Sequence, residues 1–448
     1  MPNPMSARRA AYETLRLVQS QGAYANLALS QTLKGQRLTD ADRAFTAHLV
    51  YTTLDRAIYY DYVIDQLAKG KVNQATRQVL RLGLCQLYDC QQVPDAAAVD
   101  QSVQLIRQIG KGALSGLVNG LLRRAAQGRP ALPDRERDPI AHLSVKTAQP
   151  AWLCGMWVKH YGWDMAERML AWAPAHEGVQ LRAHGISTDE LIARLGEGVI
   201  ARPGRLVPDC LSVKGLGNLA AHPLFTQGLF TAQGEASMLA VEALALRPGM
   251  RVLDACAAPG GKSAYMAQRM DNRGEILSCD VHPHRVELME QLFARLQVQI
   301  AHPVCHDATE PWHEGEMDAV LVDAPCSGLG VLAHKPDLKA RVQPGDIDAL
   351  CALQGRILQA AARSVRPGGR LVYCTCTISR RENERVAQAF ARDHGADFAP
   401  ADLTGALPAR LLGRWGLPPN MVQLIPCQDG TDGFFIAAFD RKEASTCS

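Results

Sequence analysis

The stretch that decides the fold of this chain reads Val252-Leu253-Asp254-Ala255-Cys256-Ala257-Ala258-Pro259-Gly260-Gly261-Lys262-Ser263. An apolar segment ends in an acidic residue, small residues follow, and a helix-forming segment begins after two glycines. Small residues let a backbone approach a ligand, and the N-terminus of the next helix favours an anionic group. The loop lacks the glycine spacing of a dinucleotide fingerprint and of a phosphate-binding loop. It therefore indicates either a tight strand-to-helix turn or a turn that holds a nucleotide-type cofactor.

Strands and helices alternate on the carboxyl side of this stretch. The expected strands are residues 251–254, 275–280, 319–323 and 370–375. The expected helices between them include residues 283–296 and 347–365. Such alternation predicts an α/β domain with a parallel, doubly wound, Rossmann-like sheet over residues 236–448. Residues 433–439 fit a late, antiparallel strand of the same sheet.

The amino side of the chain has a different pattern. Apolar residues recur at spacings of three and four through residues 6–127, without the alternation of strands, so we expect an all-α domain there. Residues 128–139 hold three prolines and many charges, which is typical of a linker. Helices between Trp152 and Trp172 and near 188–195, with strands near 180–182 and 211–213, predict a small α+β module. The expected domains are residues 1–139, 140–235 and 236–448.

Composition limits the class of protein. The chain has 448 residues, of which 47% are apolar and 21% charged, so it is neither disordered nor fibrous. No apolar run is long enough to cross a membrane, and Met1–Arg9 does not begin a signal peptide. The 13 cysteines are scattered, which favours a reduced, cytoplasmic protein without disulfides.

Charge is unevenly distributed along the chain. Residues 1–150 carry 19 Lys and Arg against 12 Asp and Glu, whereas the remainder carries 29 against 33. A basic front third either binds an anionic partner or is a solvated helical surface, and charge alone does not choose between them.

Acidic residues follow several expected strands. Asp254, Asp280 and Asp323 end three of them, and Asp307 lies at the expected end of another. In open α/β sheets these ends border the crevice that binds ligands. Capping of the following helices explains one or two such residues, but four favour an adenosine-type cofactor.

Two cysteine motifs end neighbouring expected strands. They read Asp323-Ala324-Pro325-Cys326-Ser327-Gly328 and Tyr373-Cys374-Thr375-Cys376-Thr377. Neighbouring strand ends bring Cys326 and Cys376 beside one crevice, although strand parity alone does not distinguish Cys374 from Cys376. No further His or Cys lies at ligand spacing, so we expect no metal.

The remaining cysteines near these motifs are expected to pack as small apolar residues. They are Cys256, Cys279 and Cys305.

These motifs carry a specific resemblance. Residues 256–262, Asp323–Gly328 and Thr375-Cys376-Thr377 with Glu382-Asn383-Glu384 look like motifs of the RNA (cytosine-5) methyltransferases. Residues 6–127 resemble the NusB helical fold. The whole arrangement is similar to the Fmu/Sun family of 16S rRNA methyltransferases B. Further matches to the family are residues 336–339 and 366–369.

The resemblance implies a reaction and a site. It implies transfer of a methyl group from S-adenosylmethionine to carbon 5 of a cytosine in 16S rRNA, without a metal, by a cytoplasmic monomer. It implies Cys376 as the nucleophile that forms a covalent intermediate and Cys326 as the cysteine that aids product release. The implied cofactor-binding residues are Cys256, Ala257, Ala258, Pro259, Gly260, Gly261, Lys262, Asp280, Asp307 and Asp323.

Several alternatives stay open at this point. A DNA cytosine methyltransferase would use a Pro-Cys such as Pro325-Cys326, but it lacks the second cysteine and the NusB-like domain. The chain could instead be a NusB-like antitermination factor with an inert methyltransferase domain, or it could act on another RNA. A dehydrogenase is disfavoured because the loop lacks the glycine fingerprint.

The chain departs from the family pattern at a few positions. The departures are Thr377 for Ser, Ala333 and His334 where two Arg are usual, His184 for Asn, and Gly234 for Asp. The loop departures fall where RNA contacts are expected, so they bear on the choice of target and not on the reaction.

Overall fold

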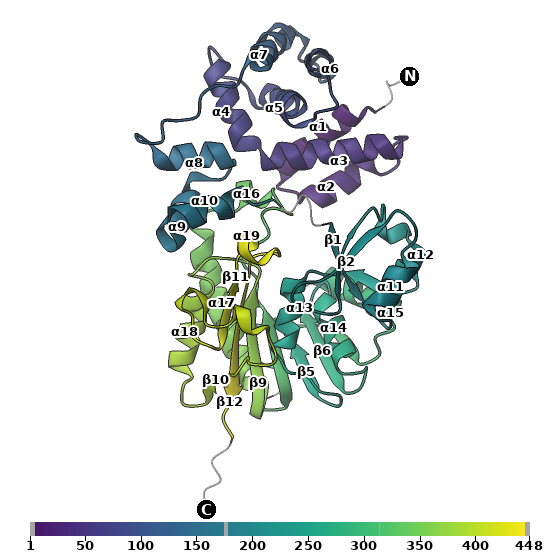
Figure 1. The fold of residues 1–448 in the computed structure, drawn as a ribbon, viewed down its shortest axis with the longest axis vertical. Coiled ribbons are helices and arrows are strands. Elements are labelled where there is room, and N and C mark those ends of the chain that lie inside the picture. Colours follow the sequence, from purple (N-terminus) through teal and green to yellow (C-terminus); the bar gives the residue numbers. More distant parts are fainter. Residues whose placement is uncertain (1–4, 174–177, 313, 444–448) are drawn as a thin grey trace, which may run out of the picture. The chain divides into compact units, whose positions relative to one another are not determined.

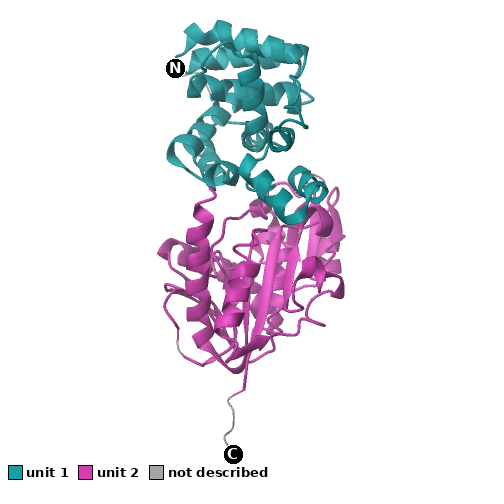
Figure 2. Cartoon of the chain, turned by 90° about the vertical axis from the view of Figure 1, so that its left-hand side faces the viewer, with its two compact units in different colours: residues 1–172, 332–342 teal, residues 173–331, 343–448 magenta. Residues whose placement is uncertain are grey.

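The computed structural model describes residues 5–173, 178–312 and 314–443, and the chain forms two compact units (Figures 1 and 2). Unit 1 comprises residues 1–172 and 332–342, and unit 2 comprises residues 173–331 and 343–448. Residues 1–4 of the segment Met1–Arg9, which is not expected to begin a signal peptide, lie outside the described residues. No helix in the described ranges combines the length and apolarity needed to cross a membrane.

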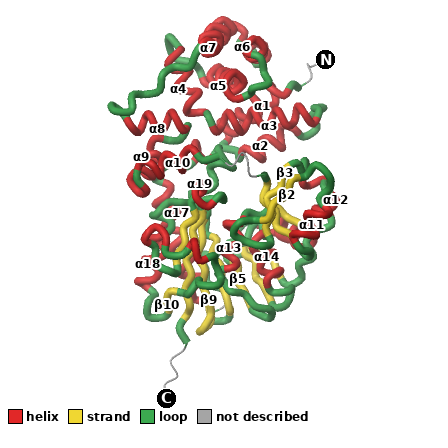
Figure 3. Tube along the Cα trace, viewed as in Figure 1, coloured by secondary structure: helices red, strands yellow, loops and turns green. Residues whose placement is uncertain are grey.

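Unit 1 is helical, as the spacing of its apolar residues predicts (Figure 3). Its central helix is α5, which buries residues on several sides, including Val79, Leu80 and Leu84. Ser6, Thr39 and Asn73 cap the starts of α1, α3 and α5 with their side-chain oxygens. The helices are α1 (Ala7–Gln21), α2 (Ala25–Leu33), α3 (Asp40–Asp55), α4 (Ala57–Leu67), α5 (Gln74–Asp89), α6 (Asp95–Gln108), η1 (Gly112–Leu114), α7 (Ser115–Gln127), α8 (Pro139–Thr147), α9 (Ala151–Tyr161), α10 (Trp163–Ala171) and α16 (Leu338–Arg341).

Unit 1 includes two segments that lie outside the N-terminal domain expected from the sequence. Residues 140–172, expected in the middle module, form helices that group with unit 1. Residues 332–342 leave unit 2 after β8 and pack in unit 1, where Lys339 Nζ donates to Asp55 Oδ1 at 2.6 Å. The Arg341 guanidinium lies 3.9 Å from the ring centroid of Tyr24. The three domains expected from the sequence stay a prediction beside this division into two packed units.

Unit 2 contains the expected α/β sheet. Its strand order is β10-β12-β9-β8-β5-β6-β7, with β11 paired to β12. The strands from β5 to β9 run parallel to their neighbours, and β12 runs antiparallel to β9, as expected. The strands are β5 (Arg251–Asp254), β6 (Glu275–Asp280), β7 (Ala301–Cys305), β8 (Met317–Asp323), β9 (Val365–Thr375), β10 (Phe398–Pro400), β11 (Met421–Leu424) and β12 (Phe434–Arg441).

Helices cover both faces of this sheet because its strands are apolar on both faces. Val252 and Val372 pack with residues of α13, α14 and α15 on one face. Leu253 and Tyr373 pack with residues of α17 and α18 on the other. The helices are α13 (Glu235–Glu242), α14 (Gly261–Arg269), α15 (Pro283–Arg295), α17 (Asp346–Ser364), α18 (Glu384–Asp393) and α19 (Pro426–Asp429), with the short turns η3 (Ala409–Leu411) and η4 (Arg414–Gly416).

A second sheet of unit 2 is antiparallel, with the order β2-β3-β1-β4. Leu181 and Phe230 pack with apolar residues of its helices. Arg182 is fully buried, donates to Gln233 Oε1 at 2.7 Å and lies 5.2 Å from the ring centroid of Tyr265 in α14. Arg182 therefore joins this sheet to the larger one. The elements are β1 (Val179–Ala183), α11 (Thr188–Arg194), β2 (Ile200–Pro203), β3 (Cys210–Lys214), η2 (Leu219–Ala221), α12 (Pro223–Thr226) and β4 (Phe230–Ala232).

Candidate active site

The strand order of the large sheet has a topological switch point between β5 and β8. From β5 the chain continues to β6 and β7 on one side, and from β8 to β9 on the other. The carboxyl ends of strands at such a switch point form the crevice in which open α/β sheets bind ligands. Asp254 and Asp323 end the two strands that flank this point, and Asp280 ends β6.

The loop after β5 forms a close-fitting turn. Ala257 N donates to Cys279 O at 2.7 Å, which ties the loop to β6. Gly260 has φ +101°, and a Cβ there would lie 3.0 Å from the Phe293 ring, so this position requires glycine. The first turn of α14 follows directly, with its free backbone N–H groups beside the strand ends.

Asp254 is the most buried carboxylate of this cluster. Ser263 Oγ donates to its Oδ2 at 2.7 Å, whereas its Oδ1 has no hydrogen-bond partner. Burial raises the pKa of Asp254 to about 7. A buried oxygen without a partner at the start of α14 is the kind of group that a bound polar ligand satisfies.

Lys262 does not point at an open phosphate site. Its Nζ donates to Asp323 Oδ2 at 2.5 Å, and both side chains are largely buried. Burial lowers the pKa of Lys262, but the attraction of Asp323 outweighs this effect and leaves the pKa raised. Cys374 Sγ donates to the other oxygen of Asp323 at 3.5 Å.

The other two predicted aspartates differ in their surroundings. Asp280 is nearly buried, accepts a hydrogen bond from His282 N at 2.9 Å and pairs with Arg285 at 3.5 Å. Asp307 is exposed, and Thr309 donates to its Oδ1 from both its N–H and its hydroxyl, which lowers the pKa of Asp307. Asp307 therefore caps its own turn through this oxygen.

The side chains of the two predicted catalytic cysteines are in contact. Cys326 Sγ and Cys376 Sγ are 3.3 Å apart, and both residues are partly exposed. The hydrogen bond that Cys326 shares with Cys376, together with burial, raises the pKa of Cys326 well above its ordinary value. Cys374 is separated from this pair, because it is fully buried and bonded to Asp323.

The other cysteines near these motifs, which are expected to pack as small apolar residues, differ in their exposure. Cys279 is buried and Cys256 is half-buried, but Cys305 is exposed, so the expectation for Cys305 is wrong. Cys305 ends β7, the edge strand of the sheet, where no further strand covers it.

The cysteine loops also touch through their backbones. Gly330 N donates to Cys376 O at 3.0 Å, and Gly433 N donates to Gly330 O at 2.9 Å. These bonds hold the loop after β8 against the loop after β9 and the start of β12. The close approach depends on the absence of a side chain at Gly330.

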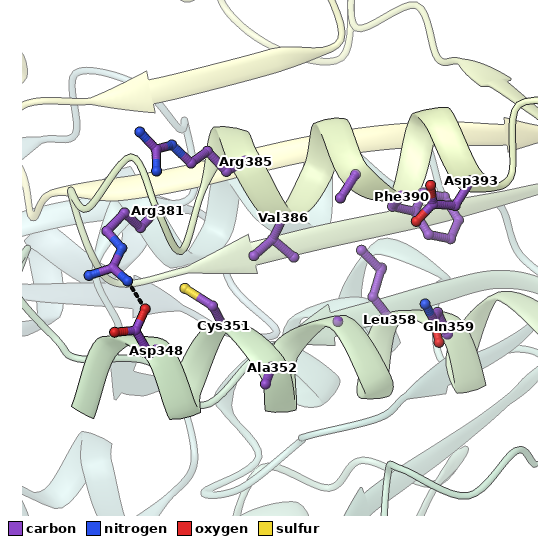
Figure 4. Close-up of a pocket in the computed structure, with 12 residues that line it drawn as sticks. Asp348, Cys351, Ala352, Leu358, Gln359, Arg381, Arg385, Val386, Phe390 and Asp393 are labelled. Carbon is purple, nitrogen blue, oxygen red and sulfur yellow. Dashed lines mark ion pairs between the residues drawn. The ribbon is translucent and has the colours of Figure 1, made fainter. Parts of the chain in front are cut away.

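A separate hollow of about 360 Å³ opens between α17 and α18 (Figure 4). Arg381 and Asp348 form an ion pair at one end of it, and Leu358 and Phe390 line its apolar part. None of the predicted site residues lines this hollow. In the part of the chain that the structure describes, no group of three His, Cys, Asp or Glu residues is arranged to hold a metal.

Comparison with known proteins accounts for this arrangement. A family described as "16S rRNA methyltransferase RsmB/F" matches residues 241–440, and the NusB family matches residues 5–127. The chain is 36% identical to the "Probable ribosomal RNA small subunit methyltransferase B" of Bacillus subtilis (strain 168), over 98% of this chain and 99% of that protein. The chain belongs to the RsmB/F methyltransferase family.

Further relatives agree with this assignment to the RsmB/F family. The "Ribosomal RNA small subunit methyltransferase B" of Xanthomonas campestris pv. campestris is 33% identical over 97% of this chain and 96% of that protein. The crystal structure of PH0851 superposes with a TM-score of 0.80 and 26% identity, covering 98% of this chain and 99% of that chain. The NusB-like helical domain and the α/β methyltransferase domain expected from the sequence are thereby confirmed.

One departure from the RsmB/F pattern has a structural account. His184 donates from Nε2 to Leu296 O at 2.7 Å, and its Nδ1 lies 3.2 Å from Gln268 Oε1. Burial lowers the pKa of His184, with the neighbouring Arg182 adding to the effect. His184 therefore serves the packing of β1 against α14 and α15. The other departures in the loop, Ala333 and His334, lie in the segment that packs with unit 1.

We predict that Gly330→Ala destabilises unit 2. The new Cβ would lie 1.9 Å from Gly433 O and 2.8 Å from Cys376 O, so the two loops must separate. Overpacking of this kind costs about 1–3 kcal/mol, and differential scanning calorimetry should show a lower unfolding temperature. Gly355→Ala in α17 is the control, because nothing lies within 4 Å of its added Cβ. Equal melting of the two variants would contradict the tight contact.

Proposed function

We propose that this protein transfers a methyl group from S-adenosylmethionine to carbon 5 of a cytosine in 16S ribosomal RNA, in the cytoplasm. The observation that carries the proposal is the pair of sulfurs of Cys326 and Cys376, 3.3 Å apart beside the strand-end aspartates. Family membership and the names of the relatives support ribosomal RNA as the substrate.

The loop and strand ends fit such a cofactor. Residues 256–262 would hold it together with Asp280, Asp307 and Asp323. When bound, S-adenosylmethionine supplies a methyl group on a positively charged sulfur. The Asp280 carboxylate retains acceptor capacity for ribose hydroxyls beside its bonds to His282 and Arg285. The unpartnered buried oxygen of Asp254 offers a further polar contact.

The cysteines can overcome the low nucleophilicity of carbon 5 of cytosine. Carbon 5 of cytosine is a poor nucleophile, and a thiolate that adds to carbon 6 makes carbon 5 electron-rich. Cys376 would form the S–C6 bond, and carbon 5 would take the methyl group, which leaves the donor as a neutral thioether. The proton on carbon 5 would then pass to solvent as the S–C6 bond breaks and its electron pair returns to the sulfur of Cys376. A hydrogen bond donated by the Cys326 thiol would favour the thiolate on Cys376, and Cys326 would then assist the departure of the product.

The smaller sheet of unit 2 offers a face for the RNA. Ile200, Arg202, Ser212 and Lys214 line a hollow of about 280 Å³ on it, and the registers of β2 and β3 place these four on one face. Arg202 and Lys214 are exposed, as phosphate-binding side chains must be. The target base must also leave its stack, which is least costly in a loop or bulge. The excess of positive charge in residues 1–150 favours a second area of phosphate contacts.

We predict that Asp280→Ala weakens the binding of S-adenosylmethionine about ten- to a hundredfold. The reason is the loss of ribose hydrogen bonds to a charged acceptor, worth about 1.5–3 kcal/mol. Isothermal titration calorimetry measures this directly, and Asp271→Ala on the exposed surface is the control. Unchanged affinity in Asp280→Ala, or tighter binding of a nicotinamide dinucleotide by the wild type, would count against the cofactor assignment.

We predict that the two cysteine variants fail differently. Cys376→Ala should form no covalent complex with RNA and transfer no methyl group. Cys326→Ala should attack and methylate but stall before release, so a protein–RNA adduct that survives denaturing electrophoresis should accumulate with S-adenosylmethionine. The double variant should show no adduct, because attack precedes release.

Other outcomes of this experiment have clear meanings. An adduct trapped with Cys376→Ala would reverse the two roles and favour the Pro-Cys nucleophile of DNA-type enzymes. An adduct with neither variant would leave Cys326 as a packing residue. A wild-type protein that binds 16S rRNA without methylating it would favour the alternative of an RNA-binding factor with an inactive methyltransferase domain.

We predict that Arg202→Ala with Lys214→Ala weakens rRNA binding and flattens its dependence on salt. Each lost phosphate contact lowers the slope of log K against log salt by about 0.7–1. Fluorescence anisotropy with labelled rRNA at several salt concentrations measures the slope. The matched control replaces Arg273 and Arg392, which are exposed on other elements of unit 2. Identical slopes for the two double variants would refute this docking face.

A further inference from the structure

A buried carboxylate lies behind the two cysteines. Glu382 is fully buried, and its Oε1 accepts a hydrogen bond from Ser327 N at 2.7 Å. Its Oε2 accepts one from Ser327 Oγ at 2.6 Å. Because Ser327 directly follows Cys326, these two bonds fix the backbone that carries the Cys326 thiol.

The same carboxylate reaches the second cysteine loop. Thr377 Oγ1 donates to Glu382 Oε2 at 3.3 Å, and the hydroxyls of Thr377 and Ser327 are 2.9 Å apart. Thr377 directly follows Cys376. One side chain therefore binds the residue after each cysteine, from a position in the sequence that belongs to neither loop.

The surrounding residues hold Glu382 in place. Gln354 of α17 donates to Glu382 Oε1 at 3.3 Å and to Pro325 O at 2.9 Å. Tyr373 OH donates to the backbone oxygen of Glu382 at 2.6 Å. Asn383 extends the support, because it accepts from Thr375 Oγ1 at 2.6 Å and donates to Thr377 O at 2.9 Å.

The partners of the Glu382 carboxylate are a backbone amide, two hydroxyls and a carboxamide, all of them neutral. A buried charge held only by neutral donors acts strongly on nearby ionisable groups, since little solvent screens it. A carboxylate that served packing alone would be costly to bury in this way. This cost points to an electrostatic task at the cysteines.

We propose that Glu382 is a positioning residue that sets the approach of the two sulfurs and keeps the proton of the pair on Cys326. The proposal rests on the proposed function, in which Cys376 attacks as a thiolate. The carboxylate anchors both loops through Ser327 and Thr377, and its negative charge opposes ionisation of the thiol that it faces.

The pKa directions agree with this geometry. The hydrogen bond to Cys376 and burial are the main causes that raise the pKa of Cys326, and the charge of Glu382 adds to them. Other groups surround the pair and remain unchanged in the test. They are Tyr373, Cys374 and Asp323 from β8 and β9, Lys262 and Asp254 around α14, and Cys351 and Arg385 near Glu382.

The first test replaces Glu382 by Gln in the full-length protein, without RNA or cofactor. Glutamine keeps the shape, and the hydroxyls of Ser327 and Thr377 can accept its N–H groups, so only the charge is lost. The rates at which iodoacetamide alkylates Cys326 and Cys376 are followed against pH by mass spectrometry of their peptides. The midpoint of the Cys326 profile should fall by about half a pH unit or more, because loss of the negative charge favours the thiolate of Cys326.

Glu384→Gln is the matched control, since Glu384 lies in the same segment but pairs with Arg380. Its alkylation midpoint should equal that of the wild type. An unchanged midpoint in Glu382→Gln, or an equal shift in both variants, would overturn the electrostatic role of Glu382. This readout needs no methylation, so it decides the inference even where the proposed reaction fails.

A second pair of variants tests the anchoring without touching the charge. Thr377→Ser keeps the hydroxyl that donates to Glu382, whereas Thr377→Val removes it at nearly the same volume. Thr377→Ser should methylate rRNA at the wild-type kcat, and Thr377→Val should lose about tenfold or more in kcat with KM for RNA unchanged. Equal kcat values for these two variants would overturn the anchoring role.

Discussion

The parallel pairing of β8 with β9 is the constraint on which the site depends. Asp323 lies opposite Cys374 in this pair, so both strands end at the same level of the sheet. The chain leaves β8 and β9 through short loops that therefore start side by side. Two cysteines that are 50 positions apart in the sequence thereby come within 3.3 Å of each other. The switch point between β5 and β8 adds the acidic strand ends beside them.

The charged side chains at this edge of the sheet have separate sets of partners. Lys262 neutralises Asp323, and Cys374 is bonded to the same carboxylate. Glu382 is held by neutral donors behind the cysteine loops, and Asp254 keeps one oxygen unpartnered at the start of α14. Glu382 thus lies behind the thiol pair, and the free oxygen of Asp254 lies beside the loop, where a bound polar ligand would meet it.

The sequence predicts the elements that local pattern controls. The bounds of β5 and β6 match the expectation residue for residue, and α15 and α17 match within a residue, because strand-end aspartates and helix-start signals mark them. The contact between Cys326 and Cys376 follows from strand order alone.

Two other features cannot be predicted from local sequence pattern, because each depends on which segments pack together at long range. They are the exposure of Cys305 on an edge strand and the grouping of α8–α10 with unit 1. The same holds for Glu382, which the sequence shows only as part of a motif, since its partners lie up to 55 positions away. The expected monomeric state and the three-domain division stay predictions.

Residues 332–342 pack in unit 1 although they follow β8 of unit 2, and this affects the order in which unit 1 is synthesised. Unit 1 includes this segment, with Lys339 bonded to Asp55, although some 160 residues of unit 2 come between it and the rest of unit 1. A ribosome releases the chain from its amino end, so the N-terminal helices emerge long before their last piece. By the time residue 342 has been synthesised, every strand from β1 to β8 has already been made. The helical unit therefore gains its last segment late in synthesis, after β8 of the other unit and before β9.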